Sequence, residues 1–280
     1  MIQTNHTRTN EVEDLELKLL LEAIFERYGY DFRQYSARHL KRQFLEFARL
    51  EGLPSLSGIQ GIILHHPSRF NHLLRHLSIG TTSLFRDPHF YRAFRERIVP
   101  ILKTFPYLRI WHAGCSTGEE VYSMAILLYE ENVYDRARIY ATDFHEAVLE
   151  EARSGSLPSA TYKEYERNYY ESGGKSNFSH YFIQKGEKLL LFRELLRKVT
   201  FAQHNLATDD SFMEFNAILC RNVLIYFNKV LQDRVHDLIY NSLSRFGVLS
   251  LGKRESLDFS CRAHLYRELN PREKLYQKIR

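Results

Sequence analysis

Apolar residues recur at helical spacing through the first part of the chain. Leu17, Leu20 and Ile24 lie three or four positions apart, which predicts an amphipathic helix that ends at Gly29. A second stretch of this kind begins at Ser36, a residue suited to an N-cap. These patterns predict a small helical domain over residues 1–78, with helices over 15–29, 36–52, 57–66 and from Ser68 onward.

The pattern changes after Asp87-Pro88, which predicts a helix start with Asp87 as its N-cap. From there, short apolar runs alternate with amphipathic stretches, as in α/β proteins with a mostly parallel sheet covered on both faces. The predicted strands cover 108–113, 137–143, 198–205, 215–222 and 248–252, and the predicted helices cover 118–131, 145–155 and 229–247.

Residues 156–197 interrupt this alternation. The stretch is rich in tyrosine and lysine, and then gives two short apolar runs on either side of Lys185-Gly186-Glu187. Two runs joined by a glycine-containing turn predict a hairpin inserted into the α/β domain.

The segment Gly114-Cys115-Ser116-Thr117-Gly118 follows the first strand of the α/β part and admits three interpretations. It matches the G-x-S-x-G nucleophile elbow of serine hydrolases, but the acid and histidine that could follow it, Asp258 and His264, are only six residues apart. A dinucleotide site requires glycine where Ser116 stands. In a site for S-adenosylmethionine, glycines let the backbone approach the ligand and an acid after the next strand binds the ribose hydroxyls. Asp143 has that position, so the third interpretation is favoured.

Composition narrows the classes further. The three cysteines are widely spaced and form no disulfide framework, and neither a signal peptide nor a bilayer-spanning apolar run is present, which predicts a cytoplasmic protein. The net charge of +5 is compatible with an acidic partner or with an ordinary basic surface, and no nucleic-acid or membrane-insertion motif accompanies it. His72 and His76 lack a third nearby ligand, so no metal site is predicted.

Four ordered segments resemble the chemotaxis receptor glutamate O-methyltransferases, the CheR family. They are "TTSLFRDPHFY", "IWHAGCSTGEEVYSMA", "VTFAQHNL" and "NAILCRNVLIYF", and "GVLSLGKRESL" resembles the family's late strand motif. The resemblance implies an all-helical N-terminal domain, followed over 79–280 by a Rossmann-like S-adenosylmethionine-dependent methyltransferase domain with a small antiparallel β-subdomain inserted at about 156–197. It further implies methyl transfer to glutamates in the cytoplasmic domains of methyl-accepting chemoreceptors, with S-adenosylhomocysteine as the product, by a protein expected to be monomeric.

The resemblance also assigns residues. Arg86 and Tyr226 are implied to lie nearest the transferred methyl group and its acceptor, and Glu120 is implied to meet the ammonium group of the cofactor. The full implied cofactor set is Thr82, Arg86, Gly114, Gly118, Glu120, Asp143, Asn205, Leu206, Arg221 and Asn222.

Three features depart from the family pattern. Gly80 stands where asparagine is usual, which removes one expected cofactor contact. Val121 replaces a proline after the Glu-Glu pair, and "GKRES" replaces "GHSES", which adds the charges of Lys253 and Arg254.

The second predicted helix carries Arg38, Lys41, Arg42 and Arg49 on roughly one face. Because the acceptor helices of the family's receptors carry clustered glutamates, this face is expected to bind and steer the receptor. Two alternatives stay open on the sequence: a signalling adaptor that binds the cofactor with little turnover, and a methyltransferase for a small carboxylate.

Overall fold

The computed structural model describes residues 2–78, 82–258 and 260–280. The chain forms two compact units, one made of residues 1–79 with 225–234 and the other of residues 80–224 with 235–280. The smaller unit is helical and the larger is α/β, as the sequence pattern predicts.

The helical unit packs four helices around an apolar centre. Leu20, Ile24, Phe44, Ile59 and Leu73 are buried there, one or two from each helix, because the apolar stripe of each amphipathic helix turns inward. A segment from late in the chain completes the unit, since the backbone N–H of Ser36 donates to the Tyr226 carbonyl at 2.8 Å. The helices are α1 (Ile2–Tyr28), α2 (Ala37–Leu50), α3 (Leu56–His65) and α4 (Pro67–Ser78).

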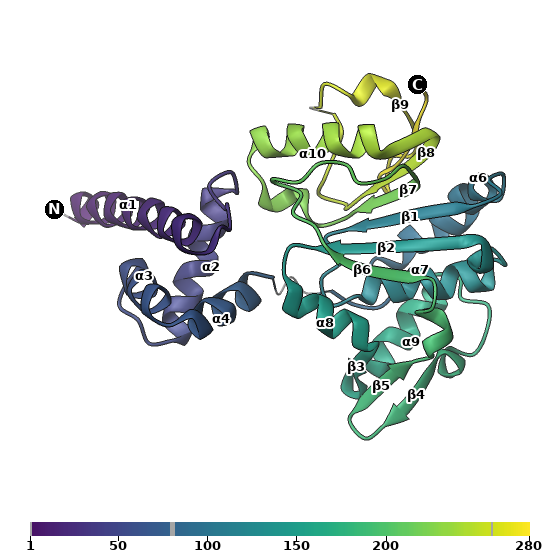
Figure 1. Cartoon of the computed structure of the whole chain (residues 1–280), viewed down its shortest axis with the longest axis horizontal. Helices are drawn as coiled ribbons and strands as arrows, with labels where there is room; N and C mark the ends of the chain where they lie inside the picture. The colour runs from purple at the N-terminus through teal and green to yellow at the C-terminus, as the bar shows by residue number, and fades with distance from the viewer. Residues whose placement is uncertain (1, 79–81, 259) are drawn as a thin grey trace. The chain divides into compact units, whose positions relative to one another are not determined.

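The larger unit is built on a seven-stranded sheet in the order β6-β2-β1-β7-β8-β10-β9 (Figure 1). The first five strands in this order run parallel, and β10 pairs antiparallel with both β8 and β9. The strands are β1 (Leu108–Ala113), β2 (Ala137–Asp143), β6 (Val199–Gln203), β7 (Phe215–Cys220), β8 (Leu243–Leu251), β9 (Tyr266–Asn270) and β10 (Leu275–Lys278).

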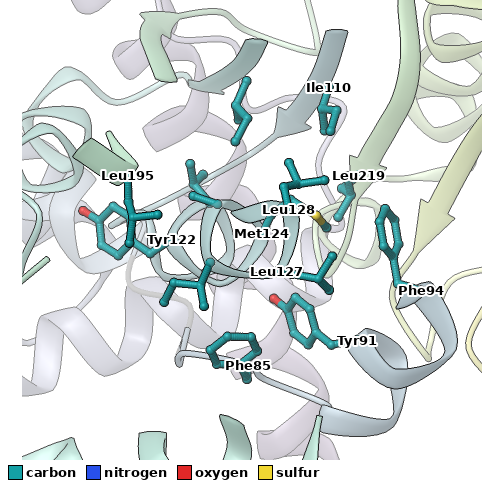
Figure 2. Packing of buried hydrophobic residues seen from close by; sticks show 14 of the residues in the cluster. Phe85, Tyr91, Phe94, Ile110, Tyr122, Met124, Leu127, Leu128, Leu195 and Leu219 are labelled. Carbon is teal, nitrogen blue, oxygen red and sulfur yellow. The ribbon is translucent and has the colours of Figure 1, made fainter. Parts of the chain in front are cut away.

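One face of the sheet packs against a large apolar cluster. Ile110 and Leu219 project from the strands toward Met124 and Leu127 of α7, and Phe94 closes the cluster from the side (Figure 2). All of these side chains are fully buried. The helices of this unit are α5 (Pro88–Ala93), α6 (Val99–Leu102), α7 (Glu119–Glu130), α8 (Glu146–Ser154), α9 (Tyr162–Glu171) and α10 (Lys229–Ser242), with a π-helical turn at Phe94–Ile98.

The inserted β-subdomain is a three-stranded antiparallel sheet in the order β3-β5-β4. Its strands are β3 (Ser156–Pro158), β4 (Phe182–Lys185) and β5 (Lys188–Leu191). Gly186 and Glu187 form the two-residue turn between β4 and β5, and Gly186 has a φ of +59°, which a two-residue hairpin turn requires. The predicted fold class, including this insertion, is confirmed.

The end of the chain differs from the prediction. The helix predicted over 229–247 ends at Ser242, and β8 begins at the next residue because Leu243 pairs with Phe215 of β7. A bulge follows before Val248 pairs with Ala217, and Phe246 has a left-handed φ of +63° there. The hairpin of β9 and β10 was not predicted.

Candidate functional site

The turn after β1 requires glycine at two positions. Gly114 has a φ of +79° and Gly118 a φ of +95°, values that favour glycine. A Cβ atom on Gly114 would lie 2.6 Å from a methyl group of Val223, and one on Gly118 would lie 2.8 Å from the Tyr122 ring. The turn therefore brings bare backbone to the carboxyl edge of the sheet, where ligands of α/β proteins bind.

Asp143 ends β2 beside this turn. One of its oxygens accepts the backbone N–H of Ser116 at 3.0 Å, and the other accepts the N–H of His145 at 3.2 Å. Burial raises the pKa of the Asp143 carboxyl, and these two hydrogen bonds act in the opposite direction. Each oxygen keeps acceptor capacity for a further donor, such as a ligand hydroxyl.

Glu120 lies in the first turn of α7, within a buried chain of charged groups. Its Oε1 is 2.9 Å from Nδ1 of His112, and its Oε2 accepts from Arg221 at 3.0 Å. Burial opposes ionisation of Glu120, but the bonds to His112 and Arg221 outweigh it, so the pKa of this carboxyl is lowered. Glu120 is therefore a fixed carboxylate at the site.

Arg221 connects this carboxylate to a second one. Its guanidinium donates to Asp87 at 2.9 Å and lies 3.8 Å from the centroid of the Phe90 ring, with only 2% of the side chain exposed. Asp87 was predicted to cap α5, but its side chain makes no cap hydrogen bond and its φ is +59°. The predicted helix start with Asp87 at the N-cap position is confirmed, and only the side-chain cap is missing, because the buried arginine competes successfully for the carboxylate. Lys253 also reaches Asp87, at 3.5 Å.

Glu255 organises the loop after β7, a role that the sequence analysis did not assign. Its buried carboxylate accepts the backbone N–H groups of Asn222, Val223, Leu224 and Gly252 at 2.6 to 2.9 Å. Asn222, with a φ of +60°, is held in the left-handed region by this arrangement. The sequence shows Glu255 three residues after Gly252, in the segment "GKRES". That position alone does not reveal which backbone amides its carboxylate binds.

The segment that carries Thr82 and Arg86 is anchored through its backbone. The N–H of Phe85 donates to the Ser123 hydroxyl of α7 at 2.8 Å, and the Phe85 ring is fully buried. Thr82 and Arg86 are both half-buried. Gly80, where the family pattern has asparagine, lies outside the described residues.

The predicted adenine-side residues follow β6. The backbone N–H of Asn205 donates to Asp209 at 2.9 Å, and its side-chain oxygen accepts the N–H of Ala207. Leu206 is buried. Two residues earlier, the His204 ring packs against the Trp111 ring, with 5.3 Å between the ring centroids. The loop is thus internally fixed.

Ser116 is not arranged as a nucleophile. It has a left-handed φ of +48°, and its hydroxyl makes no hydrogen bond with a histidine among the described residues. Asp258 accepts from Ser256 and not from His264. The relay that the serine hydrolase interpretation needs is therefore not formed in the described part of the chain.

Tyr226 belongs by its contacts to the helical unit. Its ring lies 4.5 Å from that of His39 on α2, between centroids. On the same helix Arg38, Arg42 and Arg49 are exposed.

Lys41 differs from these three arginines. It is half-buried and forms ion pairs with Glu13 and Asp14 of α1 at 3.0 and 2.7 Å. Of the four basic residues predicted to share one face, the three arginines are exposed, whereas Lys41 pairs with acids of α1. Lys41 lies about 60° around the helix from Arg38.

Within the described residues, no group of three or more histidine, cysteine, aspartate or glutamate side chains is placed to hold a metal ion. Nor does any helix there have the length and hydropathy needed to cross a membrane.

The carboxyl edge fits an adenosyl ligand that carries an ammonium group and a sulfonium. The glycine turn presents backbone at the end of β1, Asp143 offers carboxylate lone pairs, and Glu120 supplies a fixed negative charge. The buried Nε of Arg221 has no hydrogen-bond partner in the described structure, which is consistent with a missing acceptor such as a ligand carboxylate.

Two family models match the chain in sequence order. Residues 15–78 match "CheR methyltransferase, all-alpha domain" and residues 80–270 match "CheR methyltransferase, SAM binding domain". A Pseudomonas putida protein named "Putative methyltransferase Cher3" is 44% identical over 95% of this chain and 97% of its own length.

More distant relatives carry a functional name. The chemotaxis protein methyltransferase of Listeria innocua is 28% identical over 82% of this chain and 85% of its own length. The protein of the same name from Escherichia coli is 25% identical over 88% and 85%, respectively.

Proposed function

The chain belongs to the CheR methyltransferase family, and from this premise we propose that it methylates glutamate side chains in the cytoplasmic domains of chemoreceptors. It is an S-adenosylmethionine-dependent methyltransferase. The proposed products are a glutamate methyl ester and S-adenosylhomocysteine, formed in the cytoplasm during sensory adaptation. The match of both family models in order, over most of the chain, is the observation that carries this proposal.

The proposed reaction needs no general base. A glutamate side chain has an ordinary pKa near 4.3, so it is already an anionic nucleophile at neutral pH. The cofactor supplies an electrophilic methyl group on a sulfonium. The residues of this chain have to bind the two reactants, exclude water and align the carboxylate with the methyl carbon.

Arg86 is proposed to hold the acceptor carboxylate. A guanidinium presents a planar pair of donors that matches a carboxylate, and it does not neutralise the carboxylate by giving up a proton to it. Its backbone position is fixed, since Phe85 is buried and hydrogen-bonded to Ser123 immediately before it. Only the side chain, and not the backbone, then loses conformational entropy when Arg86 orders on the substrate. Tyr226 is proposed as a second contact of the acceptor, on the family resemblance alone.

The cofactor is proposed to lie along the carboxyl edge. Asp143 would accept the ribose hydroxyls and Glu120 would meet the ammonium group, while Arg221 holds Glu120 in place from the other side. Thr82, Asn205, Leu206 and Asn222 complete the proposed cofactor set with the two glycines of the turn, Gly114 and Gly118. Arg38, Arg42 and Arg49 are proposed to attract the acidic receptor.

The test is a methylation assay with methyl-labelled S-adenosylmethionine and purified receptor cytoplasmic fragments. We expect labelled glutamate residues that release methanol in base. Arg86→Ala should lower kcat/KM roughly 100-fold, because the carboxylate is no longer aligned. Ser116→Ala should retain most of the activity, whereas a hydrolase nucleophile would be lost with it.

Two outcomes would contradict the proposal. Binding of S-adenosylhomocysteine without base-labile label on any receptor fragment would favour an adaptor with little turnover. Label on small carboxylic acids, but not on receptor glutamates, would favour a small-molecule methyltransferase.

A further inference from the structure

Part of one sheet face has no helix over it. Side chains alternate along a strand, so Ile110 and Ile139 enter the α7 and α8 side, while Arg109, Arg138 and Tyr140 project from the opposite face. The connection from β6 to β7 is an irregular loop over 204–214, where the other crossovers between parallel strands contain helices. Figure 1 shows β1 and β2 without a helix drawn over the face turned toward the viewer.

Three cations line up across this face. Arg109 of β1 pairs in register with Arg138 of β2, and the register of β2 with β6 places Lys198 beside Arg138. Adjacent strands are about 4.8 Å apart, so the three side chains rise from neighbouring positions. Arg109 and Arg138 are exposed and Lys198 is half-buried.

These three cations have no acidic partners. None of them forms an ion pair with a described residue. Glu194, four residues before Lys198, pairs with Arg197 instead. Neighbouring like charges repel, so an unpaired row of three is electrostatically unfavourable until an anionic partner approaches. By contrast, the basic side chains of Arg95, Arg221 and Lys41 are all paired with acids.

A second row lies next to the cations on the same face, two residues further along each strand. Tyr140 is in register with Trp111 on one side and Thr200 on the other. Phe212 from the 204–214 loop covers the Trp111 ring and remains 44% exposed. The loop is tied down, since the Ser242 hydroxyl donates to that of Ser211 at 2.7 Å. The face thus offers a fixed apolar strip beside a cationic one.

The ring geometry favours a protein partner over a nucleic acid. Phe212 meets Trp111, Tyr140 and Phe215 at interplanar angles of 79°, 59° and 72°. Bases bind single-strand platforms by stacking on open, successive ring faces. Here the ring of Phe212 packs edge-to-face or tilted against its neighbours, so no series of open ring faces is available for stacking. The uneven apolar surface that results suits aliphatic side chains.

We propose that this open sheet face, defined by Arg109, Arg138, Lys198, Tyr140, Thr200 and Phe212, binds an acidic amphipathic helix of a protein partner. Such a helix is about 10 Å wide, which matches three strands, and its carboxylates at i and i+4 are about 5 to 6 Å apart, close to the strand spacing. Its apolar stripe would pack on Tyr140 and Phe212. The partner would occupy the place that a covering helix has in doubly wound folds.

The surface is distinct from the methyl-transfer site. Arg109 precedes the end of β1 by four residues, which is about 13 Å along the strand from the edge that carries Gly114. Charge changes at Arg109 and Arg138 should therefore leave cofactor binding and methyl transfer intact. The inference therefore stands independently of the proposed acceptor.

The experiment selects helical peptides of about four turns from a display library on the immobilised full chain. Selection is repeated on Arg109→Glu/Arg138→Glu and on the control Arg167→Glu/Arg272→Glu, which has the same charge change at two other exposed arginines. We expect wild type and control to enrich acidic peptides with apolar residues at i, i+3 and i+4. The leading peptide, labelled with fluorescein, should bind about tenfold more weakly to the sheet-face variant in fluorescence anisotropy.

Further measurements keep the test decisive. Unchanged thermal unfolding and S-adenosylhomocysteine binding establish that a variant is folded. If Arg109→Glu/Arg138→Glu does not fold, Arg109→Gln/Arg138→Gln takes its place in the peptide-binding measurement. Phe212→Ser should weaken the same peptide without changing its salt dependence. The proposal is overturned if the enriched peptides have no acidic bias, if both double variants bind equally, or if an oligo(dT) of about fifteen nucleotides binds the face more tightly than the peptide.

Discussion

At the scale of single residues, His112 is the least expected member of the site. It is fully buried at the end of β1, and its Nδ1 contacts Glu120 while its Nε2 has no partner in the described structure. The proton is therefore assigned to Nδ1, where it has an acceptor. We interpret His112 as a positioning residue that holds the Glu120 carboxylate.

His112→Leu should weaken the cofactor site. Loss of one hydrogen bond to a charged group costs about 1.5 to 3 kcal/mol, so we expect the KM for S-adenosylmethionine to rise about tenfold with little change in kcat. His112→Asn, whose amide can donate near the same place, should restore most of the affinity. Calorimetry with S-adenosylhomocysteine checks binding separately from turnover, and equal affinity in all three proteins would contradict the assignment.

Asp143 makes cofactor affinity sensitive to pH. Burial raises the pKa of its carboxyl in the free protein, and ligand hydroxyls stabilise only the ionised form. Protonation therefore competes with binding, so the Kd for S-adenosylhomocysteine should increase as pH falls toward that raised pKa, above the ordinary value of 3.8. Because the pKa of Glu120 is lowered, Glu120 should become protonated only at lower pH.

Asp143→Asn is the control for this pH dependence. The amide cannot ionise, so the variant should bind weakly and with an affinity that is flat over the same pH range. A wild-type Kd that is equally flat would show that Asp143 does not take part in binding.

At the scale of elements, the inserted subdomain is fixed to the core by a buried charge network. Glu130 at the end of α7 accepts from Arg95 at 2.5 Å and from the hydroxyls of Tyr169 and Tyr181. The backbone N–H of Lys175 adds a further bond. One carboxylate thus joins α7, α9 and the segment that leads into β4.

Glu130→Ala should destabilise the larger unit strongly. It removes one partner of a buried ion pair and the acceptor of the Tyr181 hydroxyl, while the Tyr169 hydroxyl keeps only the Ser176 carbonyl, a cost of about 3 to 5 kcal/mol. Urea unfolding followed by circular dichroism measures this. The matched change Glu194→Ala breaks an exposed pair with Arg197 and should alter stability by less than about 1 kcal/mol. Similar losses in both variants would contradict the role of the network.

Substitutions of Lys41 and Arg42, two neighbouring basic residues of α2, should have different effects: the first on stability and the second on receptor binding. Lys41→Gln breaks pairs with Glu13 and Asp14 and should lower Tm with little effect on the KM for receptor. Arg42→Gln removes an exposed charge and should raise that KM and reduce its salt dependence, because steering by surface charge is screened by salt. Receptor methylation that is unchanged in Arg42→Gln at low salt would exclude this use of α2.

The sequence predicted the helices and strands whose pattern of apolar residues is local. It did not predict elements whose structure depends on contacts with residues far away in the chain. The strands at 108–113 and 137–143 alternate with helices, and both formed as expected. Leu243 to Gly247 continue a helical pattern, yet pairing with Phe215 overrides local preference. Within the site, Asp143 and the glycine turn were accessible from spacing. The ion pair of Asp87 with Arg221 was not predicted, because Arg221 is far away in sequence.

At the scale of the whole molecule, the chain enters the helical unit twice. Residues 225–234 belong to it by their contacts, although the strands before and after them belong to the larger unit. Tyr35 packs edge-on against Phe227, 4.9 Å between ring centroids, and the N–H of Asn228 donates to the Gln34 carbonyl. A single cut in the chain therefore cannot separate the two units cleanly.

Deletion of residues 1–79 tests this organisation. The remaining fragment keeps Glu120, Asp143 and Arg221, all within the larger unit, and should still bind S-adenosylhomocysteine. The 225–234 segment loses its hydrogen bonds and ring contact with residues 34–36, so it should open more often and become accessible to protease. Limited trypsin digestion followed by mass spectrometry should find the first cuts at Lys229 and Arg234, both exposed, and much faster than in the full chain. Equal cleavage rates at these two sites in fragment and full chain would mean that the segment is held by the larger unit alone.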